Sequence, residues 1–271
     1  MFSAFRERSA SPVPLHRAIL GGTAHATGER MFGRVKCPVG ETERAWLDRS
    51  LAWLEAEFGT APARRAPVLP TAEEFPGTFG GTPEEIRGLV RRFCDRFEVD
   101  PERLVVEVED SEEADAERQL AAAIGATFES RGAAGHFRRD ATGRPVVSID
   151  RAQARRPVSL VATIAHELGH VALLDTGRLS WDAPDGEELT DLLTVYFGFG
   201  VFNANSVFTR VTDGDRLTRS RLGYLSQEQY GYALARWTLL RGDPSPAWAR
   251  HLDTNPRGYL RQSLRYLRAT S

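Results

Sequence analysis

The stretch LVATIAHELGHVALLD, residues 160–175, is the part of this sequence from which fold and chemistry can be predicted. Its strongly apolar composition predicts a helix buried in the core of a protein. Three polar side chains interrupt it, His166, Glu167 and His170. Polar groups in such surroundings cost free energy unless something satisfies them. The sequence therefore predicts that these three side chains have a partner.

A metal ion is the partner that the spacing favours. Positions i and i+4 share one face of a helix, so His166 and His170 project together and both imidazoles can bind one ion. Zinc prefers nitrogen, oxygen and sulfur ligands in tetrahedral geometry. Glu167 points to the side of that face, from where it can reach a metal-bound water without displacing it. This is the HExxH arrangement of zinc peptidases, which combines two ligands with a general base.

Acidic side chains at the end of this segment and downstream of it are candidates for the third ligand: Asp175, Asp182, Asp185, Glu187, Glu188 and Asp191. A metzincin site needs a glycine at position 173 and a histidine at position 176, whereas the sequence has Leu173 and Thr176. Glu187 and Asp191 stand i to i+4 on a second expected helix, so both can face the first one. Glu187 can bind the metal, while Asp191 accepts the outer N–H of a ligand histidine. An acidic first helical turn would explain Glu187 through the helix dipole, but not its pairing with Asp191. We therefore expect one zinc ion per chain.

The sequence here resembles a known family. HELGH at 166–170, followed by EELTD at 187–191, is similar to the gluzincin pattern, HExxH then ExxxD, of thermolysin-like and related zinc metallopeptidases. The resemblance covers under a tenth of the chain, and Gly186 stands where thermolysin-like enzymes have asparagine. It fits a small minimal gluzincin as well as a separate bacterial branch of the superfamily.

The resemblance also implies a role for each residue of the motif. It implies that His166, His170 and Glu187 are the zinc ligands, that Glu167 is the catalytic base, and that Asp191 supports a ligand histidine. No counterpart of the family's downstream catalytic histidine is evident. For the group that stabilises the oxyanion, the sequence offers Tyr224, Tyr230, Tyr232 and His251 as candidates.

The order of expected elements predicts an α+β fold rather than a doubly wound sheet. A hairpin expected at 133–149, around an Ala-Thr-Gly turn, precedes the HELGH helix, which begins near Pro157. The resemblance implies a zincin-like fold, in which a small sheet or hairpin precedes the active-site helix and the C-terminal part is helical. A strand is expected at 103–110, and the other helices are expected at 41–58, 82–97, 111–125, 185–203, 226–241, 245–253 and 257–269.

Local signals support several of these boundaries. Gly59 is expected to cap the first helix, and Thr82 with Glu85 forms a capping box for the second. Gly198 and Gly200 are expected to let two helices approach closely, since glycine inside a helix otherwise costs about 1 kcal/mol. The polar segment 206–223 reads as a surface loop.

The chain divides into two parts on composition. Residues 1–30 are rich in Ser, Gly, Pro and Arg without a clear period, and we expect a tail or loosely docked arm. Residues 31–271 form the expected metallopeptidase domain, in which 31–100 can be set apart as a helical N-terminal subregion.

Bulk properties limit the partners and the compartment. The chain is 41% hydrophobic and 27% charged with a formal net charge of −2, so no global field favours nucleic acid or an anionic membrane. We expect no apolar run to approach the roughly 18 residues that span a bilayer. No secretory signal is evident, and Cys37 and Cys94 fit reduced thiols. The prediction is a cytoplasmic protein that binds neither nucleic acid nor membrane.

These observations predict a zinc metallopeptidase, a hydrolase acting on a peptide or protein substrate. Two alternatives stay open: a peptidase-like zinc protein that serves as a binding or regulatory subunit, and a zinc hydrolase of a non-peptide amide. We also expect that one strand of the hairpin at 133–149 pairs with an extended substrate above the zinc.

Overall fold

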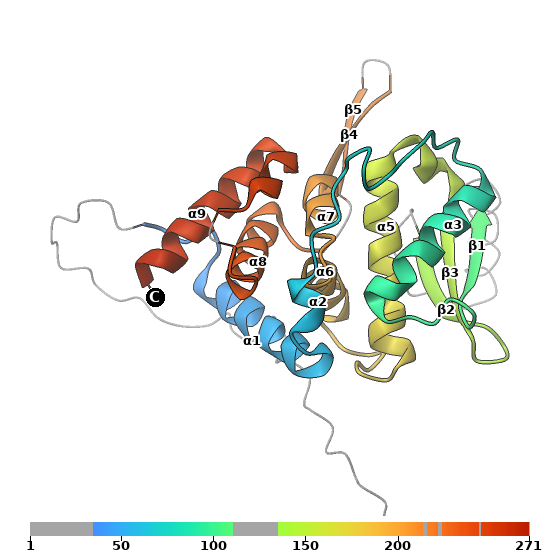
Figure 1. Cartoon of the computed structure of the whole chain (residues 1–271), viewed down its shortest axis with the longest axis horizontal. Coiled ribbons are helices and arrows are strands. Elements are labelled where there is room, and N and C mark those ends of the chain that lie inside the picture. Colours follow the sequence, from blue (N-terminus) through green and yellow to red (C-terminus); the bar gives the residue numbers. More distant parts are fainter. Residues whose placement is uncertain (1–34, 111–134, 214–215, 222–223, 244, 271) are drawn as a thin grey trace, which may run out of the picture.

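The computed structural model describes residues 35–110, 135–213, 216–221, 224–243 and 245–270, with backbone alone between 208 and 221. The fold is α+β and mostly helical, with a small three-stranded sheet, as predicted (Figure 1). The arm expected at 1–30 and the helix expected at 111–125 lie outside the described residues. The longer helices are α1 (Glu41–Phe58), α3 (Pro83–Cys94), α5 (Pro157–His170), α6 (Gly186–Tyr196), α7 (Gly200–Ser206), α8 (Gln227–Leu240) and α9 (Thr254–Thr270).

The capping signals in the first hundred residues are confirmed. α1 ends at Gly59, whose φ of 69° is a conformation that glycine adopts without strain. The side chain of Thr82 accepts a hydrogen bond from the backbone N–H of Glu85, and the Glu85 carboxylate accepts one from the backbone N–H of Thr82. The connection between α1 and α3 contains one short helix, α2 (Ala61–Arg64).

Three strands form the sheet beside α5 (Figure 1). Among the described strands the order is β1-β3-β2, so β3 is central and β2 is an edge strand of this part of the sheet. The predicted hairpin is confirmed, because β2 and β3 are antiparallel, while β1 runs parallel to β3. The strands are β1 (Val105–Glu109), β2 (Gly135–Arg139) and β3 (Pro145–Asp150).

α5 is the central helix of the fold, and it begins at Pro157 as predicted. One π-helical turn, η4 (Val171–Asp175), continues it directly after His170. Such turns are rare and are often found at functional sites.

The apolar length of this helix corrects one sequence-based expectation. Among the described residues, Pro157–Asp175 is the one helical segment long and apolar enough to cross a membrane by length and composition, at 19 residues. However, 83% of its apolar window is buried inside the protein, which is also the property of a core helix. The cytoplasmic location and the absence of membrane binding therefore stay predictions.

The prediction of one helix at 185–203 is wrong in one respect, because the chain forms two helices there, α6 and α7. Gly198 has a φ of 90°, and the N–H groups of Gly198 and Phe199 bond back to the carbonyls of Val195 and Thr194. This Schellman arrangement ends α6 and turns the chain. Gly200 does permit a close approach, because a Cβ there would lie 2.8 Å from Leu234 of α8.

The segment 206–223 is not the loop we expected. Its backbone forms two antiparallel strands, β4 (Phe208–Asp213) and β5 (Arg216–Arg221). The expectation failed because the segment is polar, whereas strand prediction relies on apolar alternation. The expected helix at 245–253 is a shorter 3₁₀ turn, η5 (Ala247–His251).

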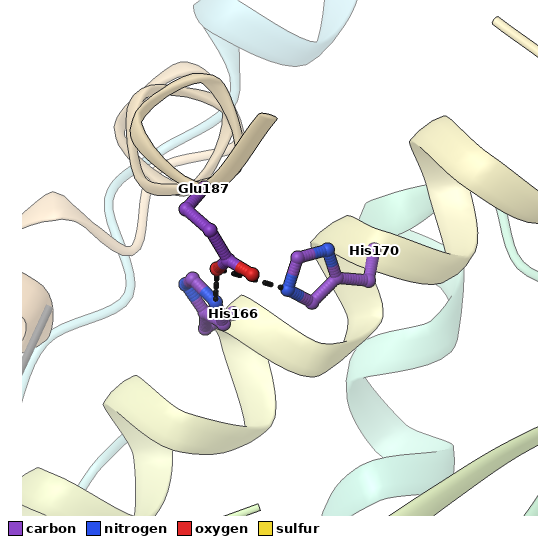
Figure 2. A group of neighbouring side chains, drawn as sticks. All are labelled: His166, His170 and Glu187. Carbon is purple, nitrogen blue, oxygen red and sulfur yellow. Dashed lines mark hydrogen bonds and ion pairs between the residues drawn. The ribbon is translucent and has the colours of Figure 1, made fainter. Parts of the chain in front are cut away.

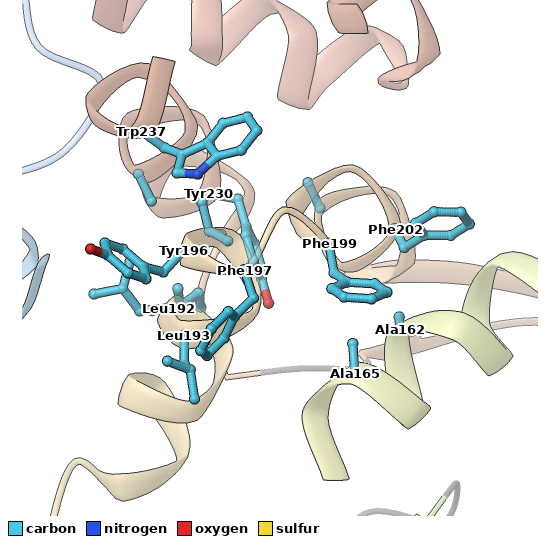
Figure 3. Packing of buried hydrophobic residues seen from close by; sticks show 14 of the residues in the cluster. Ala162, Ala165, Leu192, Leu193, Tyr196, Phe197, Phe199, Phe202, Tyr230 and Trp237 are labelled. Carbon is cyan, nitrogen blue, oxygen red and sulfur yellow. The ribbon is translucent and has the colours of Figure 1, made fainter. Parts of the chain in front are cut away.

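One buried apolar cluster runs from Val39 to Leu267. Aromatic rings of α6, α7 and α8 belong to this cluster, and Figure 3 shows Phe199 and Phe202 beside the small side chains of Ala162 and Ala165 on α5. The helices of residues 41–97 contribute to this same cluster. The packing fixes α6 against α5 and so positions the side chains considered next.

Candidate metal centre

Three side chains with metal-binding atoms meet between α5 and α6. His166 and His170 project from one face of α5, and Glu187 reaches them from the first turn of α6 (Figure 2). Their ligand atoms all lie within 4.8 Å of one another. The Nε2 atoms of His166 and His170 lie 3.0 and 3.3 Å from the same oxygen, Oε2 of Glu187. The cluster could hold a metal ion.

The other acidic candidates lie outside this cluster, and two of them pair with residues elsewhere in the fold. Asp175 pairs with Arg139, with 3.0 Å between Oδ1 and Nε. Asp185 accepts a hydrogen bond of 2.7 Å from the indole of Trp46. Glu188 is only partly buried, and burial raises the pKa of its carboxyl. Glu187 is therefore the acidic residue that the fold directs to the two histidines.

Asp191 connects the cluster to the rest of the fold. It is fully buried, and its Oδ1 lies 2.8 Å from Nδ1 of His166. Its Oδ2 accepts hydrogen bonds from the backbone N–H groups of Tyr224, at 2.6 Å, and Leu225, at 3.1 Å. These contacts orient His166 so that its Nε2 faces Glu187, and they attach the segment before α8 to the same carboxylate.

His170 has a weaker partner that the sequence reasoning missed. Oγ1 of Thr190 lies 3.4 Å from Nδ1 of His170, and it also bonds the carbonyl of Gly186 at 2.8 Å. Gly169 makes this approach possible, since a Cβ there would lie 2.9 Å from the methyl carbon of Thr190. The small residue next to His170 was the only local signal of this packing.

Electrostatics in the cluster favour a positive charge between the carboxylates. Burial opposes protonation of His166, but hydrogen bonds to Asp191 and Glu187 raise its pKa well above the usual value. Burial acts to raise the pKa of Glu187, but bonds with His166 and His170 hold it well below the usual range. The raised pKa of His166 favours a positively charged ring, and the lowered pKa of Glu187 favours an ionised carboxylate beside it.

Glu167 is buried beside the cluster, with 4% of its surface exposed. Among the described residues, its Oε2 has no hydrogen-bond partner. Burial raises the pKa of this carboxyl, while His170 and His166 act in the opposite direction. A buried polar atom without a partner costs about 1–3 kcal/mol, and such atoms call for a functional explanation.

The first residue of β2 lies directly over Glu167. A Cβ on Gly135 would be 3.1 Å from Oε1 of Glu167 and 2.8 Å from Cγ2 of Thr163. Two residues later, the ring of Phe137 stacks on His170, with centroids 6.3 Å apart and planes at 13°. β2 therefore follows α5 past Glu167 and His170, which no local sequence pattern indicated.

Of the four residues predicted as oxyanion donors, one has its ring against the cluster. The ring of Tyr224 stacks on His166, with centroids 6.0 Å apart and planes at 17°. Burial and the nearby Glu187 raise the pKa of Tyr224 to about 12, so its hydroxyl stays protonated at neutral pH. Tyr230 and Tyr232 are buried in the apolar core, and His251 belongs to η5. Tyr224 is the predicted donor whose ring contacts the cluster.

Comparison with known proteins returned no match to a family model, to a curated protein or to a solved structure. The case for function therefore depends on the arrangement of these side chains.

Proposed function

We propose that the chain is a zinc-dependent metallopeptidase of gluzincin type, with a zincin-like fold, that hydrolyses peptide bonds. The observation that carries the proposal is the His166/His170/Glu187 cluster with the buried carboxylate of Glu167 beside it, whose Oε2 has no hydrogen-bond partner among the described residues. A structural metal site needs no base, so a buried carboxylate at this place favours an enzyme over a binding or regulatory subunit.

The donor set fits zinc. Two imidazole nitrogens and one carboxylate oxygen are the ligands of many catalytic zinc sites, which leave the fourth position for water or substrate. Bond lengths of about 2.0–2.2 Å place tetrahedral ligands roughly 3.3 Å apart. The two Nε2 atoms lie 3.0 and 3.3 Å from Oε2 of Glu187, so a small adjustment would suffice. When bound, zinc lowers the pKa of a coordinated water and polarises a carbonyl group.

The residues of the chain would then divide the remaining work. Glu167 would accept the proton of the attacking water at its free carboxylate oxygen and pass it to the leaving amine. Asp191 would hold the tautomer of His166 in which Nε2 is available to the metal. Tyr224 would donate a hydrogen bond to the developing oxyanion.

The edge strand favours a peptide over a non-peptide amide as substrate. β2 pairs with β3 on one side, and among the described residues no strand pairs with its other side. An extended peptide can add to such an edge through main-chain hydrogen bonds, which a small amide lacks. β3 is paired on both sides, so β2 is the strand of the hairpin that we assign to substrate.

Substrate profiling tests the proposal directly. Zinc-loaded protein is incubated with a library of quenched peptides, with and without a chelator, and cleavage is followed by mass spectrometry. We expect cleavage that the chelator abolishes and zinc restores. Absence of cleavage, together with tight zinc binding, would favour the regulatory subunit, whereas turnover of simple amides alone would favour the non-peptide hydrolase.

A further inference from the structure

A half-exposed tryptophan lies close to the proposed catalytic centre. Trp181 is the most exposed large apolar side chain of the described residues, at 52%. It belongs to the connection between η4 and α6, the two elements that flank the metal cluster. Burial of an indole is strongly favourable, so its exposure at this place needs a reason.

Stacked rings connect Trp181 to a proposed metal ligand. The indole packs on Phe137 with centroids 5.3 Å apart and planes at 12°. Phe137 in turn stacks on His170, with centroids 6.3 Å apart and planes at 13°. Three nearly parallel rings thus lead from the cluster to the exposed indole.

Hydrogen bonds on both sides of Trp181 hold it in place. The side chains of Ser180 and Asp182 bond to each other across it, and the N–H of Ala183 bonds the carbonyl of Ser180 at 3.2 Å. Leu179 is buried and bonds the carbonyl of Leu173 on η4 at 3.0 Å. The exposed ring is therefore presented on an anchored turn.

We propose that Trp181 is the platform of a substrate subsite that takes an uncharged aromatic side chain. The inference rests on the proposed peptidase function and names the class of substrate for that same site. A flat ring held parallel to Phe137 can stack with a further ring, and aromatic pairs gain from such geometry beyond the area that they bury.

The edge strand would bring such a side chain to the platform. Residues directly opposite each other in paired strands point to the same face of the sheet. A peptide residue paired with Phe137 would therefore project toward the face that carries Phe137, His170 and Trp181. Because an extended chain rises about 3.3 Å per residue, that residue lies within a few positions of the bond at the metal.

A neighbouring charge selects against cationic side chains. The guanidinium carbon of Arg139 lies 5.8 Å from the centre of the Trp181 ring. Arg139 is fixed there, since its Nε bonds Oδ1 of Asp175 at 3.0 Å and its Nη2 bonds the Asp175 carbonyl at 2.9 Å. An indole attracts cations, but this one already has a cation, so lysine and arginine side chains would be disfavoured.

Matched peptides test the subsite. Quenched peptides that differ at one position, with Phe, Leu, Ala or Lys scanned over three residues on each side of the cleaved bond, are compared in wild type, Trp181→Ala and Trp181→Phe. We expect a preference for Phe over Ala of about two- to tenfold in kcat/KM at one position in wild type. Trp181→Ala should remove that preference, and Trp181→Phe should keep most of it.

Leu240→Ala is the control variant, because Leu240 is also an exposed apolar residue but ends α8, about 20 Å along the helix from its start. It should leave the preference unchanged. An equal preference in Trp181→Ala and wild type would overturn the subsite, as would the lack of any preference in an active wild type.

A binding measurement separates this inference from the proposed reaction. The same peptides are titrated into zinc-loaded Glu167→Gln protein, with and without Trp181→Ala, and followed by calorimetry. Tighter binding of the Phe peptide that depends on Trp181 supports the subsite even if no peptide is cleaved. Equal affinities in both proteins overturn it, whatever the outcome of the cleavage assay.

Discussion

Gly135 lies so close to Glu167 that a Cβ on it would be 3.1 Å from the glutamate's Oε1. The two residues come from different elements, the start of β2 and the last turn of α5. The strand can approach the helix this closely only because residue 135 has no side chain. The contact sets the space available to the proposed base and leads to the first prediction.

Gly135→Ala should impair catalysis without removing zinc. The new methyl group would collide with Thr163 and Glu167, so the strand or the carboxylate must move. A displacement of about 1 Å can cost roughly 10²-fold in rate, and overpacking costs about 1–3 kcal/mol of stability. Peptide cleavage, zinc content and thermal unfolding measure the three effects. Gly88→Ala is the control, since a Cβ there meets nothing within 4 Å, and wild-type kinetics in Gly135→Ala would disprove the close approach.

One zinc ion should bind per chain through His166, His170 and Glu187. Elemental analysis of purified protein should find it, and His166→Ala or Glu187→Ala should lose most of it, because each removes one of three protein ligands. Glu188→Gln is the matched control on the same turn of α6 and should retain the metal. Full zinc content in Glu187→Ala would move the third ligand elsewhere, most plausibly to Glu188.

Glu167→Gln should keep the fold and the zinc but lose hydrolysis. The amide is nearly isosteric with the carboxylate, so only the proton acceptor is lost, and a general base contributes about 10²–10⁴-fold. Single-turnover cleavage and zinc content are measured on the same preparation. Unchanged turnover in this variant would remove Glu167 from the mechanism.

Asp191→Ala should weaken zinc binding without abolishing it. Loss of the carboxylate frees Nδ1 of His166, and such losses cost about 10–100-fold in metal affinity or activity. It also leaves the N–H groups of Tyr224 and Leu225 without their acceptor, so the unfolding temperature should fall. A competitive chelator titration measures the zinc affinity, and calorimetry measures the unfolding temperature. Unaltered zinc affinity would show that Asp191 does not support the ligand.

Substrate should protect the edge strand from hydrogen exchange. In β2, alternate N–H groups face away from β3, and these should exchange quickly in the free protein. Binding of a peptide to the Glu167→Gln protein should slow exchange within 135–139. Amides of β3 serve as the internal reference because both sides of that strand are already paired. Protection within 208–221 instead would assign substrate to the β4–β5 hairpin.

Local spacing was sufficient to predict much of the cluster. The i, i+4 relation between His166 and His170, and between Glu187 and Asp191, follows from helix geometry alone. The structure brings His166, His170 and Glu187 together and places Asp191 against His166. The capping box of α3, the cap at Gly59 and the hairpin were also predictable, because each depends on residues only a few positions apart.

Contacts between distant segments were not predictable in this way. The break between α6 and α7 could have been suspected from Gly198, but the strands of 208–221 gave no apolar alternation. The stacking of Trp181 on Phe137 joins residues in separate elements, and neither lies in a motif. Periodicity reports which face of an element is apolar, and it does not report which element will cover that face.

The sequence by itself determined the position of most helices, the caps at Gly59 and Thr82, the α+β class and the residue types available for a metal, since these follow largely from patterns within a few residues. Only the tertiary structure decided that β2 is the edge strand, that Gly135 lies over Glu167, and that Asp191 holds Tyr224 and Leu225 as well as His166. Those relationships arise when apolar faces far apart in the chain are buried together. The single core that joins α1 to α9 therefore sets the surroundings of the cluster, which the motif alone leaves open.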